Sequence, residues 1–365
     1  MRILLWYWGR RGGGAQFTLG LAQALAARPD VSLRLSLSAQ GELLDTFRKL
    51  IVPTDIVDTY SDLAGFAMAL PRIPALRHNL MQSANEATVV VSGMTHLWTP
   101  LVAPGLARAG HAFVPVVHDA TPHPGDFGWA WNWRLGRELD AARAAVALSA
   151  PVAQALARRR PALPLIRMEL PALLTGPLPP RRPAPPGALR LLFFGRMRAY
   201  KGLDLLRDAF RTLHQAHPGA TLRVVGEGDV EACAPGLAAL PGVRVESRWV
   251  AEDGIPALLA EADALVAPYR EASQSGVIPQ ALAMGVPVVA TPVGGLSGQL
   301  PPGAGGVLAG AVTAAALAAA LARLFEPGVL DRLRQEAKAA GAARCDWAAA
   351  ADTLLAGLDR VLSAG

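Results

Sequence analysis

The chain has 365 residues, of which 52% are hydrophobic and 18% are charged, so it is long enough for two domains and too apolar to be disordered. Lys and Arg number 35 against 29 Asp and Glu. The two cysteines, Cys233 and Cys345, lie far apart and outside any Cys-x-x-Cys spacing, which excludes a disulfide scaffold and a cysteine-ligated zinc site.

Two features of the sequence bear on where the protein acts. No segment approaches the roughly 20 uninterrupted apolar residues that a membrane-spanning helix requires. The first strand-like segment begins at Arg2, which leaves no room for a signal peptide. We therefore expect a cytoplasmic protein that is soluble or peripheral at the inner face of the plasma membrane.

Net positive charge is concentrated in the first half of the chain. Residues 1–170 carry 17 basic and 12 acidic side chains, whereas residues 171–365 carry 18 and 17. All but three of the basic residues are arginines, which is compatible with a coding bias and also with attraction to anionic lipid or phosphate. Binding to nucleic acid is disfavoured because no basic stripe is interleaved with aromatic residues.

Short apolar runs alternate with longer amphipathic runs, a pattern that predicts parallel sheets flanked by helices. In the first half, the predicted strands are 3–8, 88–92, 112–117 and 144–148, and the predicted helices are 15–28, 100–110 and 129–143. Seven prolines then fall between Pro171 and Pro186, and they predict a stiff linker over 172–187 because proline disfavours helices and central strands.

The alternation restarts after the linker. Strands are predicted at 189–194, 221–225, 242–246, 263–267 and 286–290, and helices at 202–216, 254–261, 277–284, 312–325, 328–340 and 346–362. We therefore predict an α/β fold of two Rossmann-like domains, 1–171 and 188–344, that face a cleft. Ligands of such sheets bind beyond the carboxyl ends of the strands, so functional residues should follow the strands directly.

The first candidate loop is glycine-rich. Gly12, Gly13 and Gly14 follow the first strand and precede a helix, whose N–H groups could bind an anion. Phe17 stands where a dinucleotide-binding fingerprint would have its third small residue, and no Lys-Ser/Thr pair completes a P-loop. A tight turn without a ligand is an equally good interpretation of this segment, and an NAD-dependent dehydrogenase is disfavoured.

The second candidate loop is basic. The strand at 189–194 is followed by Gly195, three cationic side chains and the start of a helix. Arg196 and Lys201 could turn into the cleft towards a diphosphate, the first as a bidentate fork and the second as a point charge. A solvated basic loop is the alternative.

A third segment, 271–291, leads from a polar loop through a helix into the next strand. Ser275, Gly276 and Val277 should stand at the start of that helix, with backbone N–H groups free for a sugar hydroxyl or a phosphate.

Taken together, these segments resemble the retaining, nucleotide-sugar-dependent glycosyltransferases of family 4, which have the two-domain GT-B fold. The resemblance runs over most of the chain and is densest from 189 to 296. It rests on the motifs FFGRMRAYKGLDLL (193–206), VVGEGD (224–229), ADALVAPYRE (262–271) and QALAMGVPVVATPVGG (280–295). It implies that the second domain binds the nucleotide sugar, that the first receives the acceptor, and that a C-terminal helix within 345–365 crosses back to the first domain.

The resemblance also implies roles for single residues. Arg196 and Lys201 match the pair that holds the diphosphate, and Gly13 and Gly14 match the loop that faces it from the other domain. His118 resembles the histidine near the reacting carbon of the donor sugar, although a structural histidine is the open alternative.

Glycines at two strand ends complete the implied donor site. Gly195 opens the diphosphate loop, and Gly226 lies in a loop where the base is bound through main-chain contacts. His118, for its part, would be oriented by the neighbouring Asp119.

The chain departs from the family at a pair of glutamates spaced eight residues apart. Gln280 occupies the second position and Ala272 the first, with Glu271 beside it. Gln280 can accept a hydrogen bond from a ribose hydroxyl only as a neutral group. Glu271 would bind sugar hydroxyls after a shift of one residue, or Ser273 and Gln274 would take over that role. This departure puts the identity of the donor in question more than the class of reaction.

No Asp-x-Asp occurs, the usual carboxylate pair for a divalent metal in metal-dependent sugar transferases. We therefore expect no cofactor and no metal, with cations and helix N-termini stabilising the departing diphosphate. Because no carboxylate nucleophile is evident, retention would follow front-face attack.

Two segments mix large apolar residues with arginines. The first runs from Trp129 through Trp131 and Trp133 to Arg137; the second contains Leu70, Arg72, Leu76, Arg77 and Leu80. Helices in a membrane interface have this composition, and core packing is the alternative.

The sequence thus predicts transfer of a sugar to an acceptor such as a lipid-linked glycan or a surface polysaccharide precursor. Two other functions stay open: a nucleotide-sugar epimerase on the same frame, and a non-catalytic module that binds sugar or nucleotide.

Overall fold

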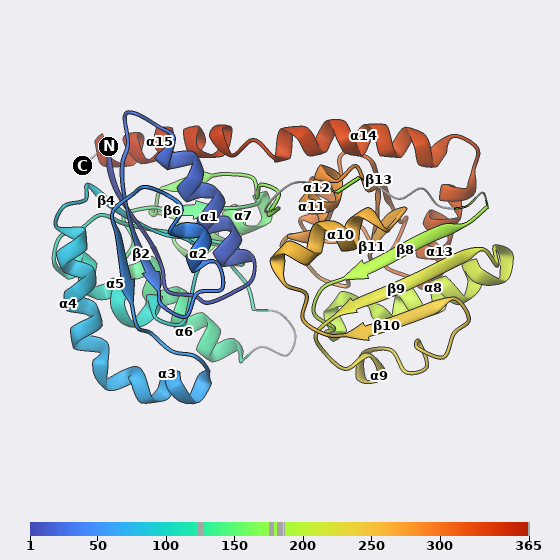
Figure 1. Ribbon diagram of the computed structural model, residues 1–365, viewed down its shortest axis with the longest axis horizontal. Coiled ribbons are helices and arrows are strands. Elements are labelled where there is room, and N and C mark those ends of the chain that lie inside the picture. Colours follow the sequence, from blue (N-terminus) through green and yellow to red (C-terminus); the bar gives the residue numbers. More distant parts are fainter. Residues whose placement is uncertain (123–126, 175–178, 181–184, 186, 364–365) are drawn as a thin grey trace. The chain divides into compact units, whose positions relative to one another are not determined.

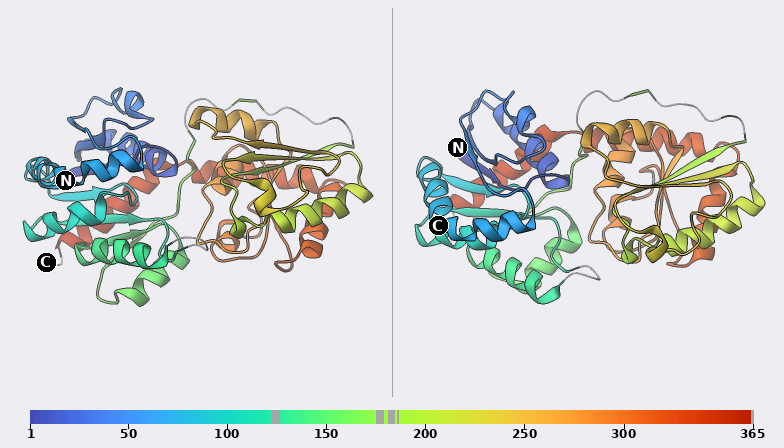
Figure 2. Two further views of the ribbon diagram at one scale, coloured as in Figure 1. Left: turned by 90° about the horizontal axis from the view of Figure 1, so that it is seen from below. Right: turned by 60° about the horizontal axis from the view of Figure 1, so that its bottom comes forward.

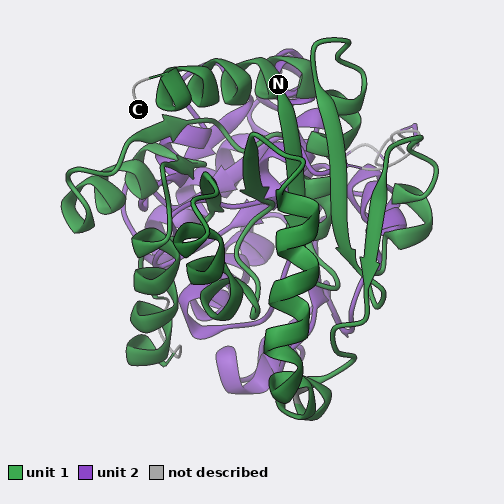
Figure 3. Cartoon of the chain, turned by 90° about the vertical axis from the view of Figure 1, so that its left-hand side faces the viewer, with its two compact units in different colours: residues 1–171, 346–365 green, residues 172–345 purple. Residues whose placement is uncertain are grey.

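The computed structural model describes residues 1–122, 127–174, 179–180, 185 and 187–363. The chain divides into two compact units (Figure 3): unit 1 comprises Met1–Pro171 and Asp346–Gly365, and unit 2 comprises Ala172–Cys345. Most of the proline-rich segment predicted as a linker lies outside the described residues. None of the described helices combines the length and the apolar character needed to cross a membrane.

The described part of unit 1 contains a seven-stranded parallel sheet in the order β3-β2-β1-β4-β5-β6-β7. The strands are β1 (Arg2–Tyr7), β2 (Ser32–Ser38), β3 (Thr54–Val57), β4 (Val89–Ser92), β5 (Phe113–Val117), β6 (Ala145–Ala147) and β7 (Leu165–Arg167). The central strands β1 and β4 are buried along almost their whole length, as expected for a sheet that is covered on both faces.

Helices cover both faces of this sheet (Figures 1 and 2). They are α1 (Gly13–Ala26), α2 (Leu44–Phe47), α3 (Leu63–Ala69), α4 (Ile73–Ala84), α5 (Thr99–Arg108), α6 (Gly128–Asp140), α7 (Ala150–Arg159) and, from the end of the chain, α15 (Trp347–Ser363). Helix α7 begins where Ser149 Oγ accepts a hydrogen bond from the N–H of Val152, a cap that satisfies one of the free donors of the first turn.

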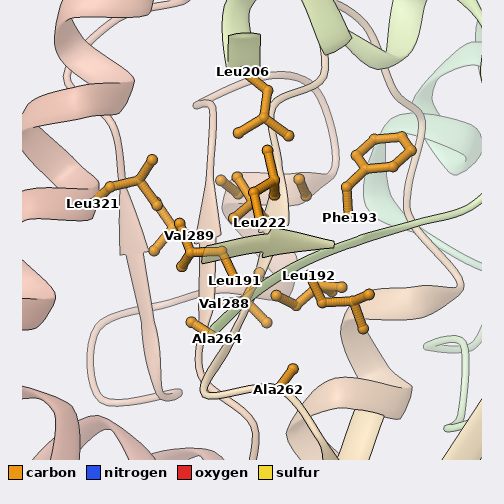
Figure 4. Packing of buried hydrophobic residues seen from close by; sticks show 14 of the residues in the cluster. Leu191, Leu192, Phe193, Leu206, Leu222, Ala262, Ala264, Val288, Val289 and Leu321 are labelled. Atoms are coloured by element: carbon orange, nitrogen blue, oxygen red, sulfur yellow. The ribbon is translucent and has the colours of Figure 1, made fainter. Parts of the chain in front are cut away.

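Unit 2 has a six-stranded parallel sheet in its described residues, in the order β10-β9-β8-β11-β12-β13. The strands are β8 (Leu189–Phe194), β9 (Ala220–Gly226), β10 (Val243–Ser247), β11 (Ala264–Ala267), β12 (Val288–Ala290) and β13 (Gly306–Leu308). The helices are α8 (Leu203–Ala216), α9 (Val230–Cys233), α10 (Ile255–Ala260), α11 (Val277–Ala283), α12 (Leu296–Gln299), α13 (Ala314–Ala322) and α14 (Val329–Arg344). Its core packs strand residues such as Leu191, Leu222 and Val289 against helix residues such as Leu206 and Leu321 (Figure 4).

The predicted α/β class and the two parallel sheets are confirmed, but the sequence pattern missed four strands. Strands β2, β3, β7 and β13 were not predicted. Strand β2 alternates serine and arginine with leucine, and the other three have only three or four residues. Such segments lack the continuous apolar run by which buried strands are recognised.

The last helix belongs to unit 1 and packs on α1. Gly20 of α1 lies directly under the indole of Trp347, where a Cβ atom would come within 2.4 Å of the ring. Phe17 contacts the same indole with ring centroids 5.7 Å apart. Gly20 is therefore the position that allows α15 to approach α1 closely.

We predict that Gly20→Val displaces Trp347 and destabilises unit 1 by about 2 kcal/mol, the usual cost of overpacking. Chemical denaturation of the variant measures this loss, and limited proteolysis reports early release of α15. Gly136→Val in α6 is the matched control, because among the described residues no atom beyond its own helical turn and chain neighbours lies within 4 Å of its would-be Cβ. Equal stability of the two variants would contradict the proposed packing role of Gly20.

Candidate functional site

The carboxyl ends of β8 and β9 approach each other closely. A Cβ atom on Gly226 would lie 1.9 Å from the carbonyl oxygen of Gly195, and both glycines have positive φ. The N–H of Met197 donates to the carbonyl of Glu227 at 2.7 Å, which joins the two loops that follow these strands. Gly226 is thus required by this backbone contact, and Gly195 is favoured by its positive φ.

Lys201 lies on an aromatic surface formed by the same unit. Its Nζ is 3.7 Å from the ring centroid of Tyr269, which is buried, and 5.2 Å from that of Tyr200. Residues Ala199–Lys201 form one 3-10 turn, and Gly202, with φ of 67°, ends that turn and begins α8. A cation on a ring face is held in place while its N–H donors stay available.

Arg196 differs from Lys201 in its surroundings. Its side chain is exposed and has no hydrogen bond or ion pair with the part of the chain that the structure describes. The guanidinium therefore keeps its donors for a ligand or for water, which leaves the predicted role and the solvated-loop alternative both open.

The polar loop 271–276 is fixed by Gln299 of α12. Its side-chain amide accepts from the N–H of Ser275 at 2.8 Å and donates to the carbonyl of Ser275 at 3.0 Å. The prediction that the Ser275 N–H is free for a ligand is therefore wrong, because a neutral side chain already satisfies it. Gly276 caps α11 and Val277 is its first residue, in the predicted place.

The two residues at the altered glutamate positions lie in different environments. Glu271 is exposed. Gln280 is buried, and its Nε2 donates to the carbonyl of Leu173 at 2.6 Å. A glutamate at 280 would place a carboxylate against that carbonyl, so the neutral amide suits the observed packing.

In unit 1 the glycine-rich segment is part of a helix rather than a loop. Helix α1 already begins at Gly13, with Gly12 at φ of 81° as its cap and no side-chain capping bond. Gly14 has the Tyr7 hydroxyl 2.6 Å from the position of a would-be Cβ. The prediction that Gly13 and Gly14 lie in a loop is therefore wrong. They form the first turn of α1, beside the end of β1.

His118 directly follows β5. Its Nδ1 lies 2.8 Å from a carboxylate oxygen of Asp119, and both side chains are partly exposed. The Asp119 carboxylate therefore orients the imidazole and leaves Nε2 pointing away from that contact. The sequence predicted this pair from adjacency alone.

A buried polar cluster at the end of β4 was not predicted from the sequence. Thr95 donates to Glu138 at 2.9 Å. The second oxygen of Glu138, both ring nitrogens of His96 and Nε of Arg134 have no hydrogen-bond partner among the described residues. Met94, which directly precedes Thr95, has φ of 58°, a strained backbone angle for a residue with a side chain. Burial raises the pKa of Glu138 to about 7 and lowers that of His96 to about 3.

The first tryptophan segment lies at the surface. Phe127, Trp129 and Trp133, which we call the α6 patch, are 79%, 78% and 50% exposed, and Arg137 lies 5.9 Å from the Trp133 ring. The core-packing alternative is therefore wrong for Trp129 and Trp133, whereas Trp131 of the same segment is half-buried and packs against the core of unit 1.

The second segment is mostly core. Leu76 and Leu80 are buried, and Arg77 donates to the carbonyl of Leu101 at 2.7 Å. Only Leu70 and Arg72 of that predicted set remain on the surface.

Within the described residues no group of three or more His, Cys, Asp or Glu side chains could hold a metal ion. The metal independence expected from the sequence remains a prediction.

Comparison with known proteins places these features in context. Residues 188–327 match the family described as Glycosyl transferases group 1. The D-inositol 3-phosphate glycosyltransferase of Segniliparus rotundus is 35% identical over 182 residues, which cover 47% of this chain and 40% of that protein. The phosphatidyl-myo-inositol mannosyltransferase of Mycobacterium leprae is 31% identical over 181 residues, covering 48% and 47%.

Each of these alignments thus spans less than half of the relative's own length. Over the whole chain, the crystal structure of Anabaena HepE in complex with UDP-glucose is similar, with a TM-score of 0.75, 18% identity and coverage of 99% and 100%. The chain has the GT-B fold, and it resembles the family 4 glycosyltransferases, as expected from its motifs.

The buried cluster yields a prediction about pH and stability. Because the pKa of Glu138 is raised in the folded state, its contribution to stability is complete below about pH 4.5 and is lost as the pH rises towards 7. Glu138→Gln keeps an acceptor for Thr95 and should remove this loss, which amounts to about 3 kcal/mol.

Urea unfolding at pH 5 and pH 8 measures the effect. We expect the variant to gain stability over the wild type at pH 8 and little at pH 5. Glu42→Gln, at an exposed position of the same unit, is the control and should leave the pH dependence unchanged. A parallel pH dependence for wild type and Glu138→Gln would contradict the assignment.

Proposed function

We propose that the protein is a glycosyltransferase that moves a sugar from a nucleotide diphosphate sugar to an acceptor. The observation that carries the proposal is the ammonium of Lys201 held 3.7 Å above Tyr269, at the carboxyl edge of the unit 2 sheet. Ligands of open parallel sheets bind at this edge. Arg196, with no partner among the described residues, supplies a second cation to the same loop.

The comparisons favour sugar transfer over the two alternative functions. The match to Glycosyl transferases group 1 covers the strands, loops and helices that carry Arg196, Lys201, Ser275 and Gln280. The relatives named above are a glycosyltransferase and a mannosyltransferase, so an epimerase or a non-catalytic module has less support.

The charges of the site suit a departing diphosphate. When the bond from the anomeric carbon to the diphosphate oxygen breaks, negative charge gathers on the diphosphate, and fixed cations stabilise it most in the transition state. We propose that Lys201 and Arg196 do this without a metal ion. Glu271, exposed in the same unit, would accept hydrogen bonds from sugar hydroxyls.

We further propose that the anomeric configuration is retained. The acceptor oxygen would form its bond to the anomeric carbon from the face that the diphosphate leaves, and its proton would pass to a diphosphate oxygen. His118, oriented by Asp119, would place a polar imidazole near the reacting carbon. The anomeric proton coupling of the product, measured by NMR, tests this step.

We predict that Lys201→Ala lowers kcat/KM for the donor at least about hundredfold, as loss of a charge-stabilising donor does in other enzymes. Lys338→Ala on α14 is the matched control, because it removes the other lysine of unit 2. The measurement is nucleotide release from a panel of UDP-, GDP- and ADP-sugars, with and without acceptor. Transfer that survives Lys201→Ala nearly intact would contradict the diphosphate role.

We also propose that the acceptor is lipid-linked and that unit 1 meets it at an anionic membrane surface. The α6 patch exposes three large apolar side chains beside Arg137. Helix α7 adds Arg158 and Arg159, and Arg159 is joined to Asn132 of α6 at 2.8 Å. Aromatic rings flanked by arginines are typical of helices that lie in the headgroup region.

We expect the protein to float with vesicles containing anionic lipid at low salt, and Trp129→Ser with Trp133→Ser to reduce the bound fraction about tenfold. Ile51→Ser is the control, since Ile51 is fully exposed outside the patch. Binding should weaken with salt, because screening reduces the attraction between arginines and lipid. No flotation of the wild type at low salt would end the membrane proposal and leave sugar transfer untouched.

A further inference from the structure

Tyr269 is held by hydrogen bonds at its side-chain hydroxyl and at its backbone carbonyl. Its hydroxyl lies 3.2 Å from Ser275 Oγ, and its backbone carbonyl accepts a hydrogen bond from the Thr291 hydroxyl. The side chain is buried, and one face of it carries the ammonium of Lys201. A ring fixed in this way gives the end of a flexible side chain a defined position.

The loop that holds the Tyr269 hydroxyl is in turn fixed by one amide. Gln299 pairs with both the N–H and the carbonyl of Ser275, as a neighbouring strand would. The backbone carbonyl of Gln299 accepts from Arg344 of α14 at 2.9 Å, so the residue that carries the amide is anchored to a long helix. Both Ser275 and Gln299 are buried, where hydrogen bonds are most costly to lose.

We propose that Tyr269 and Gln299 are positioning residues of the diphosphate site. Gln299 fixes Ser275, Ser275 fixes the Tyr269 hydroxyl, and the Tyr269 ring fixes the ammonium of Lys201. The proposal rests on the function proposed above, since it assigns the purpose of the fixed ammonium to binding the diphosphate.

A double-mutant cycle with inorganic pyrophosphate as the probe tests the link to binding. Tyr269→Leu should weaken the Kd about tenfold in the wild-type background and less than about twofold in the Lys201→Ala background. A merely structural role for Tyr269 would give the same loss in both backgrounds, and that result would overturn the proposal. Tyr200→Phe, which keeps the second ring near Lys201, is the control.

A measurement that needs no ligand tests the positioning itself. The chain has three lysines, so lysine labelled with ¹³C at Cε gives three assignable NMR signals. We expect the Lys201 Hε protons to be shifted upfield by the Tyr269 ring current, relative to those of Lys49 and Lys338. The shift should disappear in Tyr269→Leu and shrink in Gln299→Met.

Gln215→Met, at an exposed position of α8, is the matched control and should leave the Lys201 signal unchanged. An unshifted Lys201 signal in the wild type, or a signal unaffected by Gln299→Met in a variant that still melts cooperatively, would overturn the positioning. A wild-type protein with the shifted signal but without affinity for pyrophosphate would instead contradict the diphosphate role, so the two failures can be told apart.

Discussion

Close contact between backbone segments is the constraint on which the unit 2 site depends. The position of a Cβ atom on Gly202 is occupied by the carbonyl of Pro268, and those on Gly294 and Gly295 by the carbonyls of Ala272 and Ser273. Only glycine permits such approach. The end of β11 is thereby packed against the loop before α8, and the loop before α11 against the loop before α12. These contacts place Lys201 over Tyr269 and Ser275 against Gln299.

The sequence predicted the fold better than the site. Long apolar strands and amphipathic helices are visible in the letters, and β8 and α11 were placed within a residue or two. The residues that follow the strands could also be nominated, because the edge of a parallel sheet at which ligands bind is known in advance. Arg196 and Lys201 were nominated by this reasoning, whereas His118 was nominated only through the resemblance to the family 4 glycosyltransferases.

The sequence did not reveal which hydrogen-bond partner each polar group has in the folded chain. Whether the Ser275 N–H is free depends on Gln299, which is 24 residues away and reaches it only in the folded chain. Gln280 is likewise explained by the carbonyl of Leu173, over a separation of 107 residues. Pairing over such distances leaves no periodicity or spacing in the sequence. The His96 and Glu138 cluster escaped notice for the same reason.

The division of the chain has a consequence for how the protein is made. Unit 2 is continuous, whereas unit 1 consists of Met1–Pro171 and a return segment that starts at Asp346 (Figure 3). During translation the whole of unit 2 emerges before α15 is available to cover α1 and the Gly20 surface. The apolar face of α1 therefore stays uncovered until α15 has been synthesised, whereas unit 2 is free to fold before that point. In topological language, the second domain is an insertion into the first, and a nascent chain stalled after it would hold one finished domain and one unfinished domain.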